Sequence, residues 1–274
     1  MPKIAILQMT SGIDPEANLF AIEDAAQAAA GEGAQVLFTP EMATLLDRDR
    51  KRASASIEPG LVWELKERLT NYAMEFGIDI ALGSMPVPSQ EGRFANRSMY
   101  FDRNCDGPVD PVTYDKMHMF DVELSTGETW RESKAYEAGN KVVAVEDTPV
   151  GRLGLSVCYD MRFPALFEAL GNRRCDAIAV PAAFTKPTGE AHWHVLLRAR
   201  AIEASAFVIA AAQTGKHEDG RETYGHSLVV DPWGEVLLDM GEEPGLGFCD
   251  IDLGRIAEVR AQVPSLANRR EIPN

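Results

Sequence analysis

A cysteine at the end of a buried strand is the strongest candidate nucleophile in this 274-residue sequence. Cys158 lies in the segment GLSVCYDMRFP (154–164), where an apolar strand ends and a helix begins a few residues later. Such a turn holds a side chain at the carboxyl edge of a sheet, the usual place for ligands in α/β proteins. The N-terminus of the following helix would lower the thiol pKa and could hold an oxyanion. The alternative is a structural thiol, because free cysteine is among the most buried residue types.

A thiol nucleophile also needs a base, which is most often a histidine. The sequence has five histidines, and none is singled out by its position. Glu41 follows the apolar run QVLF (35–38) by a Thr-Pro step, again at the carboxyl end of a strand. Shelter at that position would raise its pKa and suit it to general-base work. Lys116 closes the strand-like run Val112–Asp115 and could supply a fixed positive charge. Taken alone, Glu41 could equally be a loop carboxylate and Lys116 a solvated lysine.

Three separated segments resemble the nitrilase, or carbon-nitrogen hydrolase, superfamily. They are FTPEM (38–42), YDKMHMFD (114–121) and VCYDMRFP (157–164). The resemblance runs from the first predicted strand to the last predicted helix. It implies a Glu-Lys-Cys triad formed by Glu41, Lys116 and Cys158, in that chain order.

The resemblance also implies further roles at the same site. Glu132, in Arg-Glu-Ser (131–133), matches a second glutamate of the family that positions the lysine and the substrate, and Glu128 is the nearest competitor. Attack by the Cys158 sulfur on an amide carbon would give an acyl-thioester. Its oxyanion would lie against Lys116 and the backbone N–H of Tyr159. The expected chemistry needs no metal ion and no organic cofactor.

Three later segments indicate a branch of the superfamily. The stretch TGEAHWHVLLRARAIE (188–203) resembles the branch of deaminated-glutathione amidases and omega-amidases, while AAAQTGKH (210–217) and YGHSLVVDPWG (224–234) favour the former. The implied substrate is an amide of a small 2-oxo acid, deaminated glutathione first. An omega-amidase acting on 2-oxoglutaramate, or another small aliphatic amide or nitrile hydrolase, is the alternative. His194 stands where these relatives commonly have Glu.

Such substrates are anionic, whereas the chain carries a formal charge of −15, so the pocket must supply local cations or N–H donors. Arg162, four residues after the cysteine, could pair with a carboxylate or could equally anchor the loop. Lys186 is a weaker candidate. Phe184 and Thr185 follow the predicted strand 177–180, and we expect them to line the pocket.

The sequence predicts an α/β protein in which short apolar strands alternate with amphipathic helices. Together with the resemblance this gives a four-layer α-β-β-α sandwich with two similar β/α halves. We expect a single domain over 1–274, with a tail from about residue 264. The clearest elements are the strand Lys3–Met9 and three helices. The predicted helices run from Pro15 to near Gly31, over Leu61–Phe76, and from about His192 to Ala204.

Composition excludes several classes of protein. A content of 45% hydrophobic residues and the charge of −15 indicate a folded chain that binds neither nucleic acid nor an anionic membrane. The longest apolar run, 206–212, is too short to span a bilayer, and the first ten residues lack the features of a secretion signal. Four cysteines without a Cys-x-x-Cys pair argue against a zinc or disulfide framework and favour the cytoplasm.

Two further hypotheses remain open at this stage. One is a metal-dependent hydrolase that uses His192 and His194 with His217 or His226, although residues two apart on a helix point to different faces. The other is a catalytically silent binding or assembly protein that keeps the fold. The resemblance further implies a homodimer or a larger homo-oligomer.

Overall fold

The structure is a computed structural model that describes residues 1–105, 110–123, 127 and 129–270. Within them, two six-stranded sheets form the centre of the molecule. The first sheet has the order β16-β1-β2-β3-β4-β5, with the bounds Gly245–Asp250, Lys3–Gln8, Val36–Phe38, Asp79–Pro88, Phe94–Phe101 and Val112–Asp115. The second has the order β15-β14-β11-β10-β9-β8, with the bounds Val236–Asp239, Leu228–Val230, Phe207–Ala210, Ala177–Ala179, Gly151–Leu155 and Ala144–Thr148.

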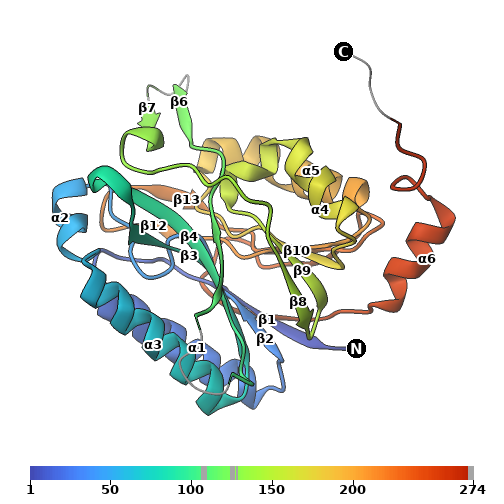
Figure 1. Ribbon diagram of the computed structural model, residues 1–274, viewed down its shortest axis with the longest axis horizontal. Helices are drawn as coiled ribbons and strands as arrows, with labels where there is room; N and C mark the ends of the chain where they lie inside the picture. The colour runs from blue at the N-terminus through green and yellow to red at the C-terminus, as the bar shows by residue number, and fades with distance from the viewer. Residues whose placement is uncertain (106–109, 124–126, 128, 271–274) are drawn as a thin grey trace.

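The two sheets are built alike. Strands β1, β2 and β3 pair in parallel, as do β9, β10 and β11. Antiparallel strands flank each parallel set. The helices α1 (Pro15–Gly31) and α3 (Pro59–Phe76) cover the first sheet, and α4 (Pro164–Asn172) and α5 (Lys186–Ala204) cover the second (Figure 1). The predicted four-layer α-β-β-α sandwich is therefore confirmed.

Alternation along the buried strands explains why two sheets can share one core. Ile4 and Ile6 of β1 belong to the hydrophobic cluster that joins the sheets, whereas Ala5 and Leu7 belong to the cluster under α1 and α3. Successive side chains of a strand point to opposite faces, so a strand that is apolar at every position must be covered on both sides. The run KIAIL (3–7) therefore predicts an inner strand of a layered fold.

Several helix boundaries follow from local chemistry. Helix α1 begins after Asp14, whose side chain accepts the Glu16 N–H at 3.0 Å, with Pro15 at the first helical position. Helix α3 ends at Gly77, which has a φ of +67°. The first of these helices was predicted with the bounds that the structure has.

Other elements differ from the prediction. Helix α5 begins at Lys186 rather than near His192, because Pro187 fits the first turn of a helix. Several short elements have no periodic pattern that would predict them. These are helix α2 (Arg50–Ala55), the hairpin β6 (Asp121–Glu123) with β7 (Thr129–Arg131), and the hairpin β12 (Thr214–Lys216) with β13 (Glu222–Tyr224).

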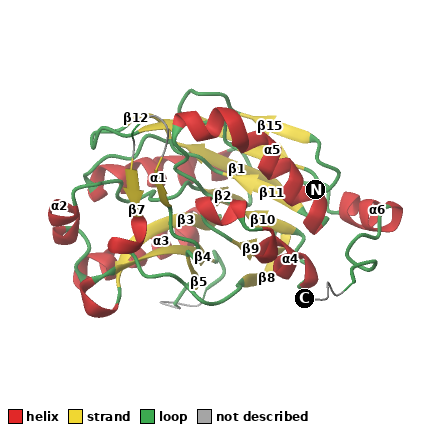
Figure 2. Ribbon diagram, turned by 90° about the horizontal axis from the view of Figure 1, so that it is seen from above, coloured by secondary structure: helices red, strands yellow, loops and turns green. Residues whose placement is uncertain are grey.

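The remaining segments are short or peripheral. Three 3-10 turns span Gln90–Gly92, Glu132–Lys134 and Cys158–Arg162. Helix α6 (Gly254–Gln262) lies beyond the edge of the sandwich in both views (Figure 2). None of the helices in the described part of the chain has the length and apolar character that crossing a bilayer requires.

A close approach at Gly83 joins the two halves beside the carboxyl ends of their strands. A Cβ atom there would lie 2.1 Å from the Thr39 carbonyl oxygen, 2.3 Å from that of Pro40 and 2.5 Å from Cβ of Pro181. Pro181 in turn accepts the backbone N–H of Cys158 at 2.8 Å. Backbone atoms on both sides leave no room for a side chain, so the requirement for glycine is steric.

We expect Gly83→Ala to lower the free energy of unfolding by about 1–3 kcal/mol or more, the usual cost of overpacking a core. Urea denaturation of the purified chain measures it. Gly60→Ala is the matched control, because no atom lies within 4 Å of its added Cβ and the site is in the first turn of α3. This control should be neutral or stabilising by up to about 1 kcal/mol. Equal stability of the Gly83→Ala protein and the wild type would contradict the packing argument.

Candidate active site

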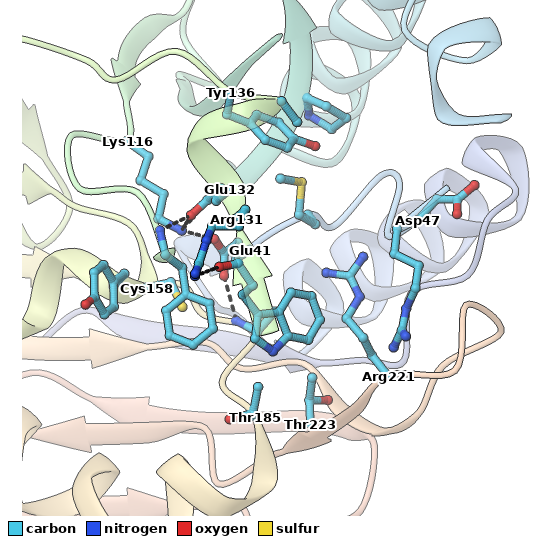
Figure 3. Close-up of a pocket in the computed structure, with 18 of the residues that line it drawn as sticks. Glu41, Asp47, Lys116, Arg131, Glu132, Tyr136, Cys158, Thr185, Arg221 and Thr223 are labelled. Atoms are coloured by element: carbon cyan, nitrogen blue, oxygen red, sulfur yellow. Dashed lines mark hydrogen bonds and ion pairs between the residues drawn. The ribbon is translucent and has the colours of Figure 1, made fainter. Parts of the chain in front are cut away.

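The candidate residues lie where strands of the two sheets end. Glu41 follows β2 and Lys116 follows β5, both in the first sheet. Cys158 lies three residues after β9 in the second sheet. Figure 3 shows Glu41, Lys116, Glu132 and Cys158 gathered at one end of a cavity. The structure thus brings together side chains that are up to 117 positions apart in the sequence.

Lys116 is at the centre of this cluster. Its side chain is 2% exposed, and its Nζ lies 2.9 Å from Glu41 Oε1 and 2.9 and 3.0 Å from the two oxygens of Glu132. Burial alone would lower the pKa of Lys116, but Glu132, Glu41 and Cys158 raise it well above its ordinary value. The ammonium is therefore a fixed cation, buried because two carboxylates compensate it.

Cys158 is held in a strained turn. Its φ is +49°, a left-handed conformation that is uncommon for a residue with a side chain, and it opens a five-residue 3-10 segment. Burial raises the pKa of Cys158 well above its ordinary value, the Glu41 carboxylate raises it further, and Lys116 opposes both. The prediction of a lowered thiol pKa is wrong, because desolvation and a facing carboxylate outweigh a short helical turn.

Glu41 has the opposite shift from the one expected. Burial by itself would raise its pKa, but Lys116, the Cys158 thiol and the Ala183 N–H, at 2.9 Å from Oε2, lower it below the ordinary value. The resting pair is therefore a charged Glu41 carboxylate and a protonated Cys158 thiol. This is the arrangement of a general base beside a protonated nucleophile.

Two buried residues that the sequence analysis missed support this cluster. The Asn96 side-chain amide donates to Glu41 Oε1 at 2.9 Å and to Glu132 Oε1 at 3.4 Å, and the Asn96 backbone carbonyl accepts the Lys116 backbone N–H at 2.9 Å. Asp160 accepts from the Tyr114 hydroxyl at 2.7 Å and from the Val157 N–H at 2.9 Å, which fixes the turn that carries Cys158. A polar residue that is fully buried in a strand is the signal that could have identified Asn96.

The cavity has a volume of about 410 Å³ and extends away from the cluster. Phe184 and Thr185 line it. Figure 3 shows Asp47 and Arg221 at the end opposite to Cys158. The charged lining residues among those described comprise five cations and four carboxylates, namely Arg48, Arg50, Lys116, Arg131, Arg221, Glu41, Asp47, Glu132 and Glu222.

Arg162 is not among the described lining residues. Its guanidinium carbon lies 5.1 Å from the ring centre of Phe184, and its Nη1 is 3.3 Å from Nδ1 of His192. The Lys186 ammonium forms an ion pair with the Glu242 carboxylate at 3.4 Å. Arg162 was predicted either to pair with a substrate carboxylate or to anchor the loop. Its contacts favour the second role, as an anchor beside the wall of the pocket. Glu128, the competitor of Glu132, lies outside the described residues.

The histidines do not form the metal site that the sequence left open. None of them is among the described residues that line the cavity. His217 is buried against Ser11 and Thr223, while His192 contacts Arg162. His194 instead meets His226 and Asp239, away from His192.

Comparisons with known proteins found relatives that match nearly the whole chain. Residues 3–261 match the family model described as "Carbon-nitrogen hydrolase". The chain is 40% identical to "Deaminated glutathione amidase" of Yersinia enterocolitica, over 97% of this chain and 92% of that protein. The crystal structure of the Caenorhabditis elegans NitFhit protein superimposes with a TM-score of 0.88 at 37% identity, covering 98% of this chain and 65% of that one.

A further solved structure bears on the cysteine of a related enzyme. The E41Q mutant of an amidase from Nesterenkonia sp. AN1 carries acrylamide added to its active-site cysteine. It is 28% identical to this chain with a TM-score of 0.79, over 96% of this chain and 98% of that one.

The two pKa shifts predict the pH dependence of hydrolysis. The lowered pKa of Glu41 means that it should keep its charge until the pH falls below 4.5, the ordinary pKa of a glutamate. The raised pKa of Cys158 means that it should keep its proton even above pH 9.0, the ordinary pKa of a thiol. We therefore expect kcat/KM to be flat between about pH 6 and 8. In Glu41→Gln the base is lost, so alkylation of Cys158 should rise about tenfold per pH unit over this range. A bell-shaped profile centred near neutrality in the wild type would contradict the assigned protonation states.

Proposed function

The chain belongs to the carbon-nitrogen hydrolase family and is an amidase; we propose that it hydrolyses deaminated glutathione through an acyl-thioester on Cys158. The observation that carries this proposal is that the Glu41 carboxylate contacts the buried Lys116 ammonium at 2.9 Å at the end of the cavity where Cys158 also lies.

In the acylation step, Glu41 takes the thiol proton as the Cys158 sulfur forms a bond to the amide carbon. The carbonyl electron pair moves to oxygen, and the oxyanion lies against the Lys116 ammonium and the Tyr159 N–H. The N–H of Tyr159 is in the first turn of a 3-10 segment, where donors have no acceptor within the helix. Removing one such donor commonly costs about 10²–10³ in rate.

Collapse of the tetrahedral intermediate breaks the carbon-nitrogen bond, and Glu41 gives its proton to the departing amine. Glu41, again a carboxylate, then takes a proton from a water molecule that attacks the thioester carbon. The second intermediate releases the acid, and the sulfur recovers the proton from Glu41. Glu132 acts in both steps by fixing the Lys116 ammonium through two hydrogen bonds.

Two features support an anionic substrate. Deaminated glutathione carries carboxylates at both ends, and the relatives at 38–40% identity bear the name of an amidase for it. Arg221 and Arg48 lie at 5.6 and 5.7 Å from the ring centre of Trp130, in the half of the cavity away from Cys158. The indole N–H of Trp130 is buried and has no acceptor among the described residues. We assign this cationic end to a carboxylate of the substrate.

We also propose that the chain acts in the cytoplasm as a homodimer or larger homo-oligomer. Val195 and Ile202 of α5, with exposures of 68% and 50%, support the assembly, since they leave apolar surface on the outer layer. Cys158, Cys175 and Cys249, all free thiols, fit a reducing compartment.

A comparison of two substrates tests the function directly. We expect kcat/KM for deaminated glutathione to exceed that for 2-oxoglutaramate by about tenfold or more, because only the former has a second carboxylate for the cationic end. Cys158→Ala, which deletes one sulfur, should fold and lose turnover by at least about 10³-fold. A preference for 2-oxoglutaramate would identify an omega-amidase instead, and a folded Cys158→Ala protein with substantial activity would refute the thioester.

The assignment of Arg221 makes a separate prediction. Its Nε donates to Asp219 at 2.6 Å, which fixes the guanidinium against the cavity. Arg221→Met should raise KM for deaminated glutathione about 10–100-fold, the value of a charge-assisted hydrogen bond. Its kcat/KM for the neutral amide propionamide should change little. Arg152→Met is the matched control, since Arg152 pairs with Glu146 at 2.7 Å outside the described cavity lining, and it should leave both substrates nearly unaffected. Equal losses on both substrates would make Arg221 structural.

A further inference from the structure

A cluster of two histidines and an aspartate lies outside the catalytic cavity. His194 Nε2 is 2.9 Å from Asp239 Oδ2, and His226 Nδ1 is 2.8 Å from Asp239 Oδ1. One ligand atom from each of the three side chains lies within 4.8 Å of the other two. Their side chains are 22–34% exposed, so an ion could reach them from solvent.

The three residues come from three different elements. His194 is on helix α5, His226 is in the connection between β13 and β14, and Asp239 is the last residue of β15. His226 follows His194 by 32 positions, and Asp239 follows His226 by 13. This spacing does not match a metal-binding sequence motif. The fold alone brings the ligands together.

Neighbouring groups fix the two imidazoles and the carboxylate. The His226 ring stacks on Tyr224 at 4.5 Å, and the His226 backbone, with a φ of +55°, donates to the Gly241 carbonyl at 2.6 Å. The Gly241 N–H donates to Asp239 Oδ1 at 3.0 Å. These contacts orient the carboxylate before any ion arrives.

We propose that His194, His226 and Asp239 bind a divalent transition-metal ion of the zinc class. Two imidazole nitrogens and one carboxylate oxygen suit Zn²⁺ and its neighbours rather than Mg²⁺ or Ca²⁺, which prefer oxygen ligands alone. In a tetrahedral zinc site with bonds near 2.0 Å, adjacent ligand atoms lie about 3.3 Å apart. The two imidazole nitrogens lie 2.9 and 2.8 Å from oxygens of Asp239, a few tenths of an ångström short of this, and within 4.8 Å of each other.

Three protein ligands leave a fourth position open in a tetrahedral site, and Glu190 is the acidic residue of α5 nearest in sequence to His194. It precedes His194 by four positions on α5, so the two lie on the same face of the helix, and it is exposed. Its charge acts on Tyr224, whose ring centre is 6.1 Å from that of His194. Water or the Glu190 carboxylate would fill the fourth position.

The ion would fasten the outer helix to the cavity wall. Thr185 and Thr188, at the start of α5, and Thr223 of β13 all line the cavity. The same helix packs tightly on β13, because a Cβ atom at Gly189 would lie 2.2 Å from the Tyr224 ring. The Trp193 indole also donates to the His226 carbonyl at 2.7 Å. The bound metal would therefore stabilise the fold from outside the catalytic cluster, with no part in the reaction, and the inference is independent of the proposed substrate.

Titration of the full chain with Co²⁺, followed by absorption, tests the coordination. The Cys158→Ala background removes the nucleophilic thiol as a competing ligand. We expect one equivalent of Co²⁺ to give the d–d bands of a four-coordinate nitrogen and oxygen site. Zn²⁺ should displace it, and Zn²⁺ at about 100-fold above its Kd should raise Tm by about 5 °C or more.

Three variants assign the ligands. His194→Gln, Asp239→Asn and His226→Asn should each abolish both the bands and the rise in Tm; asparagine tolerates the left-handed backbone of His226. His192→Gln, on the same helix but outside the cluster, is the control and should retain both. Circular dichroism shows whether each variant is folded. Absence of the bands in the parent protein, or their persistence in the three variants, would overturn the proposal and leave a hydrogen-bonded His-Asp-His contact.

Discussion

The buried ammonium of Lys116 is the constraint on which the catalytic site depends. A lysine that is 2% exposed is tolerated only where carboxylates repay the loss of water, and here Glu41 and Glu132 do so at 2.9 Å each. The three groups come from the ends of β2 and β5 and from a 3-10 turn. Removal of Lys116 would leave two buried carboxylates without their cation, so chemistry and packing cannot be separated at this place.

The scaffold meets this constraint through rigid backbone at the ends of strands. The Gln213 side chain donates to the Glu41 carbonyl at 2.9 Å, and Pro181 accepts the Cys158 N–H at 2.8 Å. Gly83 allows the loops on either side to come into contact. Each catalytic side chain is thus fixed by groups from the opposite sheet or from a neighbouring strand, and the site cannot form until both halves of the sandwich are in place.

Local chemistry made most of the fold predictable from the sequence. The apolar runs of β1, β2 and β11 and the cap of α1 carry their own signals. The family resemblance supplied the grouping of Glu41, Lys116 and Cys158, which spacing alone left open. The direction of their pKa shifts could not be predicted, because it depends on how far burial is offset by neighbours that only the fold brings near. Arg221 was missed for the same reason, since it lies in the connection of a two-stranded ribbon with no periodic pattern.

The position of the proton explains how one cluster can serve every step of the reaction. With the thiol protonated and both glutamates charged around Lys116, the cluster carries one net negative charge. When Glu41 accepts the proton and sulfur attacks, that charge moves to the substrate oxygen, which lies against the same ammonium. The net charge is unchanged from the resting state to the intermediate, so Asn96 and the other fixed donors need not rearrange. A site whose total charge stays constant while the charge moves a few ångströms is electrostatically preorganised, and this is why a buried cation is more useful here than a solvated one.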